Sequence, residues 1–456
     1  MRTPSAGRFR ACFRRIFLVL AVAVLALLVL AAIRIVYAFR DRTPGYHLSL
    51  HIARRAPETE APFLRVGFGR RTINPDLSNP NRPVWLAGFA GGRAATTIHD
   101  DLWAVACVID DGRTRLGIVS LDAIGMFNDD VIAARRLLPA GWKLDYTIIC
   151  ATHNHSTPDL LGLWGPRIFQ TGVDRAYLRR VQESIREALG EAVSSLQPAD
   201  LSLMEIPVHP AGLVADSRKP EVFDPDIRVM LFTRPDAAAV IGSVVSWADH
   251  PETPWSRNTG ITADFPGVLR DSLERGIVYD GQLRMEGLGG IHLYVNGAIG
   301  GLMTTDPETA VRDPFTGEEI SQPSQKKSRA LGNAIAQRIL KHAASERIAP
   351  AQTAAICVHA RSVELPIANF NFLLAPVLGL LDRGHVRWKT LRTEAALVTI
   401  GEAAIACIPG EIYPELVNGG IERAPGGDFD VDPVEVPHLR ALMPGKVKFV
   451  FGMAND

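Results

Sequence analysis

The chain has 456 residues, of which 47% are hydrophobic and 21% charged, so it can fold as one large α/β unit or two smaller domains, and its composition excludes a disordered chain. Lys and Arg total 49, as do Asp and Glu, and this balance gives no reason to expect a nucleic acid partner. Five cysteines are scattered without a C-x-x-C pair, which excludes a disulfide framework and a thiolate metal cage.

The N-terminal region combines basic residues with a long apolar run. Five arginines and no acidic residue precede residues 16–33, which carry no charge, Gly or Pro. About 18 to 20 helical residues cross a hydrocarbon core of about 30 Å, and basic residues ahead of such a helix favour a cytoplasmic N-terminus. We therefore expect a cytoplasmic tail (1–15), a transmembrane signal anchor (16–36) and an exported remainder, periplasmic or extracellular. A cleaved signal peptide and a buried core helix are the alternatives.

The segment 37–62 is polar and rich in Arg and Pro, which predicts a stalk between the membrane and the body. From residue 63 to 456 apolar strand-like runs alternate with helical patterns, so we predict an α/β body of mixed β-sheets flanked by helices. The predicted strands are 63–68, 102–109, 116–120, 146–150, 227–232, 240–247, 291–295, 354–365, 395–400 and 403–408. The predicted helices are 128–138, 175–196, 263–275, 324–344 and 411–419.

One apolar segment, Phe370 to Leu381, does not fit the alternation. It is too short to span a bilayer and is interrupted by Pro376. Three interpretations stay open: part of the core, an exposed loop that dips into the membrane interface, or part of a lipid channel.

The first candidate site is the sequence Ala151-Thr-His-Asn-His-Ser, which follows the predicted strand ending at Cys150. Ligands gather at the carboxyl edge of strands in α/β sheets. Two histidines at i and i+2 on an extended backbone point to the same side, and neutral imidazole is a zinc ligand. His153 and His155 are therefore candidate ligands, with ordinary loop histidines as the alternative.

Two further apolar strands end in residues that can bind a metal. One is followed by Asp249-His250-Pro251 and the other by Pro409-Gly410-Glu411. A structural histidine and a helix-capping glutamate are the alternatives when each is taken alone. Taken together, the three strand ends supply two histidines and a glutamate, a catalytic zinc set that leaves a position open for water.

Seven blocks of the sequence resemble the neutral/alkaline non-lysosomal ceramidase family, in the order seen in its N-terminal catalytic domain, across roughly residues 63 to 456. They are Arg65-Val-Gly-Phe-Gly, Leu86-Ala-Gly-Phe, Ile98-His-Asp-Asp-Leu-Trp-Ala, Val119-Ser-Leu-Asp, Ala151-Thr-His-Asn-His-Ser, Asp249-His-Pro and Ile408-Pro-Gly-Glu. The resemblance implies that His153, His250 and Glu411 bind zinc. It also implies that His155 stabilises an oxyanion or a bound water.

The sequence departs from the family pattern in two places. The family nucleophile is a Ser in a Gly-Asp-x-Ser segment, and the corresponding stretch here is Gly301-Leu-Met-Thr304. Thr304 is thus the candidate nucleophile, with Leu302 replacing the Asp and Thr305 as a competing hydroxyl. The family also has a Tyr zinc ligand beyond a segment like Phe451–Asp456. We therefore expect the domain to be truncated at its C-terminal end, or the fourth position to be filled by water or another group, with Tyr413 as a weak substitute candidate.

Two acidic positions in the family blocks have less certain roles. His99-Asp100 opens a predicted strand, and we expect hydrogen bonding rather than catalysis there. Asp122 ends another strand at the same predicted sheet edge, where it would orient a zinc-bound histidine or cap a loop.

The leading hypothesis is therefore a membrane-anchored, zinc-dependent amidohydrolase that cleaves the N-acyl bond of ceramide-like lipids. The alternatives are a zinc hydrolase of the same scaffold that acts on another amide or ester, and a non-catalytic lipid-binding relative.

Overall fold

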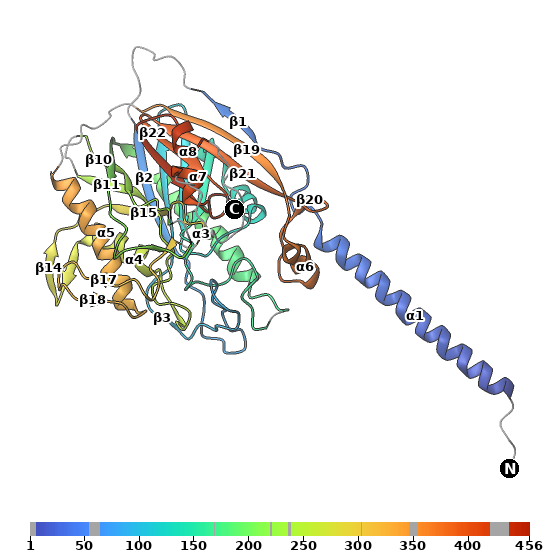
Figure 1. Ribbon diagram of the computed structural model, residues 1–456. Helices are drawn as coiled ribbons and strands as arrows, with labels where there is room; N and C mark the ends of the chain where they lie inside the picture. The colour runs from blue at the N-terminus through green and yellow to red at the C-terminus, as the bar shows by residue number, and fades with distance from the viewer. Residues whose placement is uncertain are drawn as a thin grey trace.

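Three β-sheets make up the body of the chain (Figure 1). The computed structural model describes residues 6–53, 64–167, 169–218, 221–235, 239–301, 303–345, 354–419 and 437–456. The first sheet has the order β6-β5-β4-β2-β7, with bounds Tyr146–Ala151, Arg115–Leu121, Trp103–Asp110, Arg65–Thr72 and Gln197–Pro198. The second has the order β15-β11-β10-β8, with bounds Ile291–Asn296, Val240–Trp247, Ile227–Thr233 and Asp200–Ile206.

The third sheet brings the two ends of the body together. Its order is β1-β19-β21-β22-β23, with bounds Ser49–Ile52, Ile356–Pro366, Thr390–Ile400, Ala403–Cys407 and Val447–Phe451, and β20 (His385–Arg387) pairs with β21. Short two-stranded pairings join β3 (Thr97–Ile98) to β12 (Gly260–Ile261), β9 (Ala215–Asp216) to β16 (Met303–Thr304), β13 (Ile277–Tyr279) to β14 (Gln282–Met285), and β17 (Val311–Arg312) to β18 (Glu319–Ile320).

One hydrophobic core is shared by all three sheets. Ile118 of the first sheet, Val244 and Leu293 of the second, and Ile405 and Phe449 of the third belong to the same buried cluster. Each sheet contains a parallel pair, β5 with β6, β11 with β15, and β22 with β23. Parallel pairs are usually buried on both faces, and the apolar runs that predicted β6, β11 and β22 reflect this.

Helices cover the outer faces of the sheets (Figure 1). Helix α3 (Arg175–Ser194) lies on β2 and β4, and α4 (Asp264–Arg275) and α5 (Gln325–Ser345) pack against each other beside β15. Asp174 caps α3 by accepting from the backbone N–H of Ala176 at 2.8 Å. The other helices are α2 (Asn128–Arg136), α6 (Phe370–Leu378), α7 (Pro414–Asn418), α8 (Leu439–Leu442) and a short 3₁₀ turn, Ala140–Trp142.

The mixed α/β fold confirms the predicted class, and the ten predicted strands correspond to observed ones with shifts of a few residues. Strands β8 and β23 were not predicted. The helix predicted over 411–419 begins only at Pro414, because Pro favours the first helical position, so Glu411 lies in the loop before it.

Helix α1 (Ala6–Ala38) projects away from the body (Figure 1). Its segment Phe13–Ala38 has a mean hydropathy of 3.4 in its most apolar window, none of which is buried, so by length and composition it can cross a membrane. A buried core helix is therefore the wrong interpretation, whereas a membrane anchor and a signal sequence both agree with the structure.

The segment expected to be a stalk contributes to the body. Ser49–Ile52 pairs with β19 in antiparallel register, and Leu48, Leu50 and Ile52 pack against the shared core. These alternating apolar residues explain why the segment joins a sheet. Residues 54–62 of the expected stalk and residues 1–5 of the expected tail lie outside the described residues.

Candidate metal centre

The candidate residues converge from the three sheets. His153 and His155 follow β6 of the first sheet, His250 follows β11 of the second, and Glu411 follows β22 of the third. The three histidines are buried, and each offers a ligand nitrogen within 4.8 Å of the other two. The structure thus brings together residues that are up to 258 positions apart in the sequence, the separation of His153 and Glu411 (411 − 153).

The two histidines of the H-x-H motif meet for a reason other than the predicted one. Strand β6 ends at Ala151, and His153 has a φ of 63°, in the left-handed region that is uncommon for a residue with a side chain. The backbone therefore turns between the histidines, and their ring centroids lie 5.2 Å apart. Uncommon backbone conformations of this kind concentrate at functional sites.

Backbone carbonyls fix the orientation of His153 and His250. Nδ1 of His153 donates to the carbonyl of Ile124 at 2.7 Å, and Nδ1 of His250 donates to that of Met303 at 2.6 Å. A carbonyl only accepts, so the proton of each neutral ring is on Nδ1 and the lone pair is on Nε2. Metal-binding histidines are usually held by a hydrogen bond of this kind.

Glu411 lies between the two free nitrogens. Its Oε1 is 3.2 Å from Nε2 of His153, and its Oε2 is 3.3 Å from Nε2 of His250. Burial opposes ionisation of Glu411, but His153 and His250 outweigh it when a proton on Nε2 gives each ring a positive charge, and they then hold the pKa of the carboxyl far below its ordinary value. Two ligands about 2.0–2.1 Å from a tetrahedral zinc lie about 3.4 Å apart, so the observed separations fit a metal shared by the three side chains.

Accessibility is uneven around this cluster. The Glu411 side chain is 38% exposed, whereas those of His153 and His250 are 9% and 1% exposed. Solvent therefore reaches the cluster from the Glu411 side.

His155 has a different set of neighbours. Its Nδ1 lies 2.7 Å from Oε2 of Glu252, but in the part of the chain that the structure describes neither ring nitrogen makes a well-aligned hydrogen bond, and both are buried. Burial lowers the pKa of His155 to about 4, against the opposing effect of Glu252, so the ring is neutral at pH 7. The carboxylate favours the proton on Nδ1, which leaves Nε2 as an acceptor.

Gly88 explains one block of the family resemblance. It has a φ of +103°, and a Cβ at this position would lie 2.3 Å from Cγ of His155. The next residue, Phe89, places its ring edge-on to His155 with centroids 5.0 Å apart. The Leu86-Ala-Gly-Phe block therefore forms one wall around the His155 ring.

Glu252 is the central residue that sequence reasoning missed. Its Oε2 contacts His155, and its Oε1 accepts a hydrogen bond of 2.5 Å from the hydroxyl of Thr304. Burial opposes ionisation, but His155 above all, then His250 and Thr304, lower the pKa of Glu252 to about 2. The available signal was its position, two residues after His250 in His-Pro-Glu.

The structure separates the two candidate hydroxyls. Thr304 is buried in β16 and forms a β-bridge with His250, so its hydroxyl lies beside the histidine cluster. The hydroxyl of Thr305 instead donates to Asp249 at 2.7 Å. Thr304 is therefore the hydroxyl next to Glu252, and Leu302, the residue in place of the family Asp, lies outside the described residues.

The expected role of Asp122 in orienting a histidine is wrong. Both Asp122 oxygens accept from Arg270, at 2.8 and 2.7 Å, and one of them also accepts from the backbone of Trp103. The nearby carbonyl of Ile124 orients His153 in its place. Asp100 accepts from the Thr262 hydroxyl and the Ala263 backbone, the hydrogen-bonding role expected for it.

Tyr413, the candidate substitute ligand, packs beneath another side chain. The guanidinium of Arg218 lies 4.7 Å from the centroid of the Tyr413 ring, and it also pairs with Glu415 at 2.7 Å. This cation–π contact gives Tyr413 a structural role beside α7.

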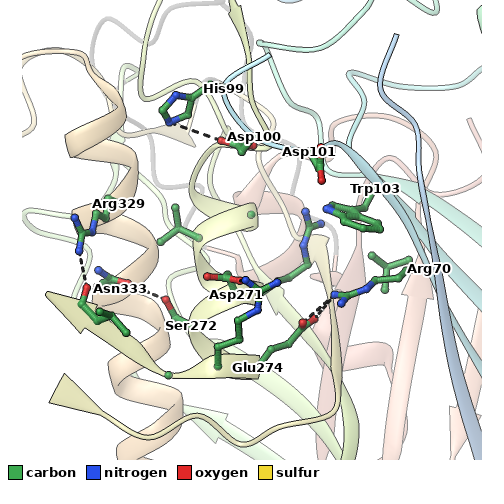
Figure 2. Close-up of a pocket in the computed structure, with 17 residues that line it drawn as sticks. Arg70, His99, Asp100, Asp101, Trp103, Asp271, Ser272, Glu274, Arg329 and Asn333 are labelled. Carbon is green, nitrogen blue, oxygen red and sulfur yellow. Dashed lines mark hydrogen bonds and ion pairs between the residues drawn. The ribbon is translucent and has the colours of Figure 1, made fainter. Parts of the chain in front are cut away.

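A separate pocket of about 800 Å³ lies between β4, α4 and α5 (Figure 2). Two of its arginines are neutralised by carboxylates in the pocket, Arg70 by Glu274 at 2.8 Å and Arg275 by Asp271 at 3.1 Å. None of the candidate metal or catalytic residues lines it.

No family model and no curated protein matches the sequence. Among solved structures, the chain is similar to the neutral ceramidase from Pseudomonas aeruginosa, with 16% identity, a TM-score of 0.58, and coverage of 77% of this chain and 63% of that one. It is also similar to a ceramidase complexed with C2, with 15% identity, a TM-score of 0.61, and coverage of 87% of this chain and 69% of that one.

The chain therefore has a neutral ceramidase-like fold, which confirms the resemblance found in the sequence. It spans less than two thirds of the length of the Pseudomonas enzyme. Within this fold, a buried histidine cluster is suited to hold a metal ion.

Proposed function

We propose that this chain is a zinc-dependent hydrolase that cleaves the linear N-acyl amide bond of ceramide-like lipids. The observation that carries the proposal is the Glu411 carboxylate, which faces the free Nε2 atoms of both His153 and His250. Two acceptor nitrogens and a carboxylate repel one another, so the site attracts a cation, either a metal ion or protons on the two rings. The ceramidase-like fold supports the choice of an amide substrate.

His153, His250 and Glu411 would hold the metal, and zinc bound there would polarise the acyl carbonyl of the substrate. The carbonyls of Ile124 and Met303 keep the two imidazoles in the tautomer that a metal requires. His155 is also within reach of the other histidines, so a set of three histidines is the alternative ligand set.

Thr304 would act as the nucleophile. As its oxygen attacks the acyl carbon, its proton passes to Oε1 of Glu252, the acceptor 2.5 Å away. The carbon–nitrogen bond then breaks, and the departing amine takes the proton from Glu252, which becomes a carboxylate again. The acyl group is left on Thr304 as an ester.

His155 would assist the second step. Glu252 lies beside its Nδ1, so the neutral Nε2 accepts a proton from the water that attacks the ester. The ester bond then breaks, the Thr304 oxygen takes that proton from Nε2, and the fatty acid is released. In this role Glu252 is shared by the two steps, because each of its oxygens contacts one of the two reacting side chains.

The membrane location is a further part of the proposal. A lipid substrate suits an enzyme whose α1 crosses a bilayer, with residues 1–15 in the cytoplasm and the body on the exported side. Carbonate extraction of cell membranes, with the intact mass of the extracted protein, tests this arrangement. Retention of residues 1–38 in the membrane fraction supports an anchor, and a chain that lacks them indicates a cleaved signal.

The enzymatic proposal is tested by fatty acid release from a ceramide in mixed micelles. We expect turnover by the wild-type chain, a loss of at least about 100-fold in Thr304→Val, and activity in Thr304→Ser. Thr305→Val is the matched control, since that hydroxyl bonds to Asp249. An acyl group on the peptide containing Thr304, seen by mass spectrometry, would identify the nucleophile. Full activity in Thr304→Val would contradict it and favour direct attack by water.

The same assay on other acyl substrates separates the alternatives. The replacement of the family Ser by the more hindered Thr304 is the observation that favours a different amide or an ester. Turnover of simple N-acyl amides or acyl esters, without turnover of ceramide, would establish that second function. A zinc-loaded chain without turnover of any acyl substrate would indicate a lipid-binding protein.

A further inference from the structure

Helix α6 presents an apolar surface outside the body. Its sequence, Phe370–Leu378, contains no charged residue. Leu373, Ala375 and Pro376 are buried, and this side of the helix packs near Phe127. The opposite side exposes Phe370 at 70%, Leu374 at 40% and Leu378 at 39%, which recur every four residues along the helix. Apolar side chains gathered in this way mark an interaction surface.

The C-terminal end of α6 is attached to α1. The guanidinium of Arg34 donates to the carbonyl of Pro376 at 2.6 Å and to that of Val377 at 2.7 Å. The last carbonyls of a helix have no partner within the helix, and a cation also complements the negative end of its dipole. Arg34 therefore fixes α6 beside α1, and Figure 1 shows α6 where α1 meets the body.

This attachment sets the depth of α6 relative to a membrane. The uncharged run of α1 ends at Ile33, so Arg34 is the first charged residue on the body side of the span. Charged side chains at the end of a spanning helix lie at the boundary between hydrocarbon and headgroups. A helix bonded to Arg34 lies at the same boundary.

Aromatic and basic residues lie close to Arg34 and α6, at the expected boundary between hydrocarbon and headgroups. Trp388 is 61% exposed, and its ring lies edge-on to Phe39 with centroids 4.5 Å apart. The Arg40 guanidinium lies 3.8 Å from the centroid of the half-exposed Tyr37 ring. Tyr and Trp are enriched at membrane interfaces, where one side of the ring is apolar and the other is hydrated.

We propose that α6 and Trp388 form a second membrane contact, in which the exposed face of α6 lies in the headgroup–acyl boundary of the bilayer that α1 crosses. The proposal rests on α1 remaining attached as an anchor and is independent of the hydrolytic activity. Of the three interpretations of the segment Phe370 to Leu381, the proposal favours a segment that dips into the membrane interface, while the buried side of α6 contributes to the core.

The chain after α6 packs against the loop that follows the H-x-H motif. The carbonyl of Leu380, just after α6, lies 2.0 Å from where a Cβ at Gly162 would be. Gly162 belongs to that loop, between β6 and α3.

Nitroxide accessibility in the full-length protein tests the contact without an activity assay. Single labels are placed at Phe370→Cys and at Leu283→Cys, in a background with Cys12→Ser and Cys357→Ser, because Cys107, Cys150 and Cys407 are buried. Leu283 is 53% exposed and belongs to β14, a strand on the opposite side of the body from α1, so it is a matched aqueous control (Figure 1). Leu374→Cys replaces Phe370→Cys if that variant does not fold.

In nanodiscs of phosphatidylcholine and phosphatidylglycerol, we expect the label at 370 to collide with oxygen and to be protected from a water-soluble nickel chelate. The label at 283 should be exposed to the chelate and collide less with oxygen. Equal exposure of both labels to the chelate would overturn the proposal. Protection of the 370 label from both reagents would also overturn it, because a protein surface and not lipid would then cover α6. An intact mass that shows the loss of residues 1–38 would also overturn the proposal, because α1 would then be absent from the mature protein.

Discussion

Glu252 connects the two side chains that we propose to react with the substrate. Each of its oxygens contacts one of them, Thr304 at 2.5 Å and His155 at 2.7 Å. A carboxylate in this position can accept a proton and orient an imidazole at the same time. Glutamine, the neutral amide analogue of glutamate, cannot accept the proton.

We therefore predict that Glu252→Gln lowers kcat by at least about 100-fold, the usual contribution of a positioned proton acceptor. The zinc content should not change, because Glu252 is not among the proposed ligands. Steady-state kinetics and metal analysis of the same samples test this. Glu402→Gln, at an exposed surface position, is the control. A Glu252→Gln enzyme with more than half of the wild-type kcat would contradict the assigned role.

The lowered pKa of His155 makes a second prediction, on stability. The folded protein holds this ring neutral with a pKa of about 4, whereas the unfolded chain takes up a proton near pH 6.5. The stability gained is present above pH 6.5 and is lost as the pH falls toward 4, because the unfolded state binds the proton first. From pH 7 to pH 5 the loss from this one group is about 2 kcal/mol.

Urea unfolding of the metal-free protein at pH 7 and pH 5 measures the effect, with His155→Gln for comparison. The variant should lose less stability than the wild type over this interval. Burial raises the pKa of Asp264 to about 6, which acts in the opposite direction in both proteins and so cancels in the comparison. Identical losses in the two proteins would show that His155 does not titrate as proposed.

The sequence was informative about the residues that act through their side chains. His153, His155, His250 and Glu411 each follow an apolar run, and the structure places them together. The carbonyls that orient the two histidines carry no residue-type signal, so no sequence pattern could indicate them. This is why Asp122 was one candidate partner of a histidine, although the carbonyl of Ile124 holds that position.

At the scale of elements, two segments approach closely where the chain after α6 meets the loop that follows His153 and His155. Gly162 has a φ of +114°, and a Cβ there would lie 2.0 Å from the Leu380 carbonyl oxygen. An alanine at this position would need both a disfavoured backbone conformation and a displacement of the chain after α6.

We predict that Gly162→Ala lowers the free energy of unfolding by about 1–3 kcal/mol, as residues forced into such backbone conformations do. Gly141→Ala is the matched control, because a Cβ at Gly141 meets no atom within 4 Å and its φ is not positive. That control should change stability by less than about 0.5 kcal/mol. Urea denaturation of both variants gives the comparison, and equal stabilities would contradict the tight contact.

Strands with continuous apolar runs could be predicted, and interrupted ones could not. β6, β11 and β22 are buried along their length and match the predicted segments closely. β8 is an edge strand that includes Asp200, Ser202 and Glu205, so its apolar signal is broken. β1 was hidden within a polar segment, and it became a strand only because β19 offered a free edge.

At the scale of the whole molecule, the candidate centre depends on the meeting of three sheets. Local sequence patterns show where a strand lies, but they do not show which sheet it joins or which strand ends meet. The joint occurrence of His153, His250 and Glu411 after three strands suggested a common site, and the resemblance to the ceramidase family supplied the ligand assignment. Their convergence itself is a property of the tertiary structure.

The most direct test of this account is the metal content of the purified full-length protein and of His153→Ala, His250→Ala and Glu411→Ala. We predict about one zinc per chain in the wild type and its loss in each variant, with zinc retained in His99→Ala, an exposed histidine outside the cluster. Loss in His155→Ala but not in Glu411→Ala would favour the three-histidine set. A folded wild-type protein that takes up no zinc when it is supplied in excess would contradict the central claim.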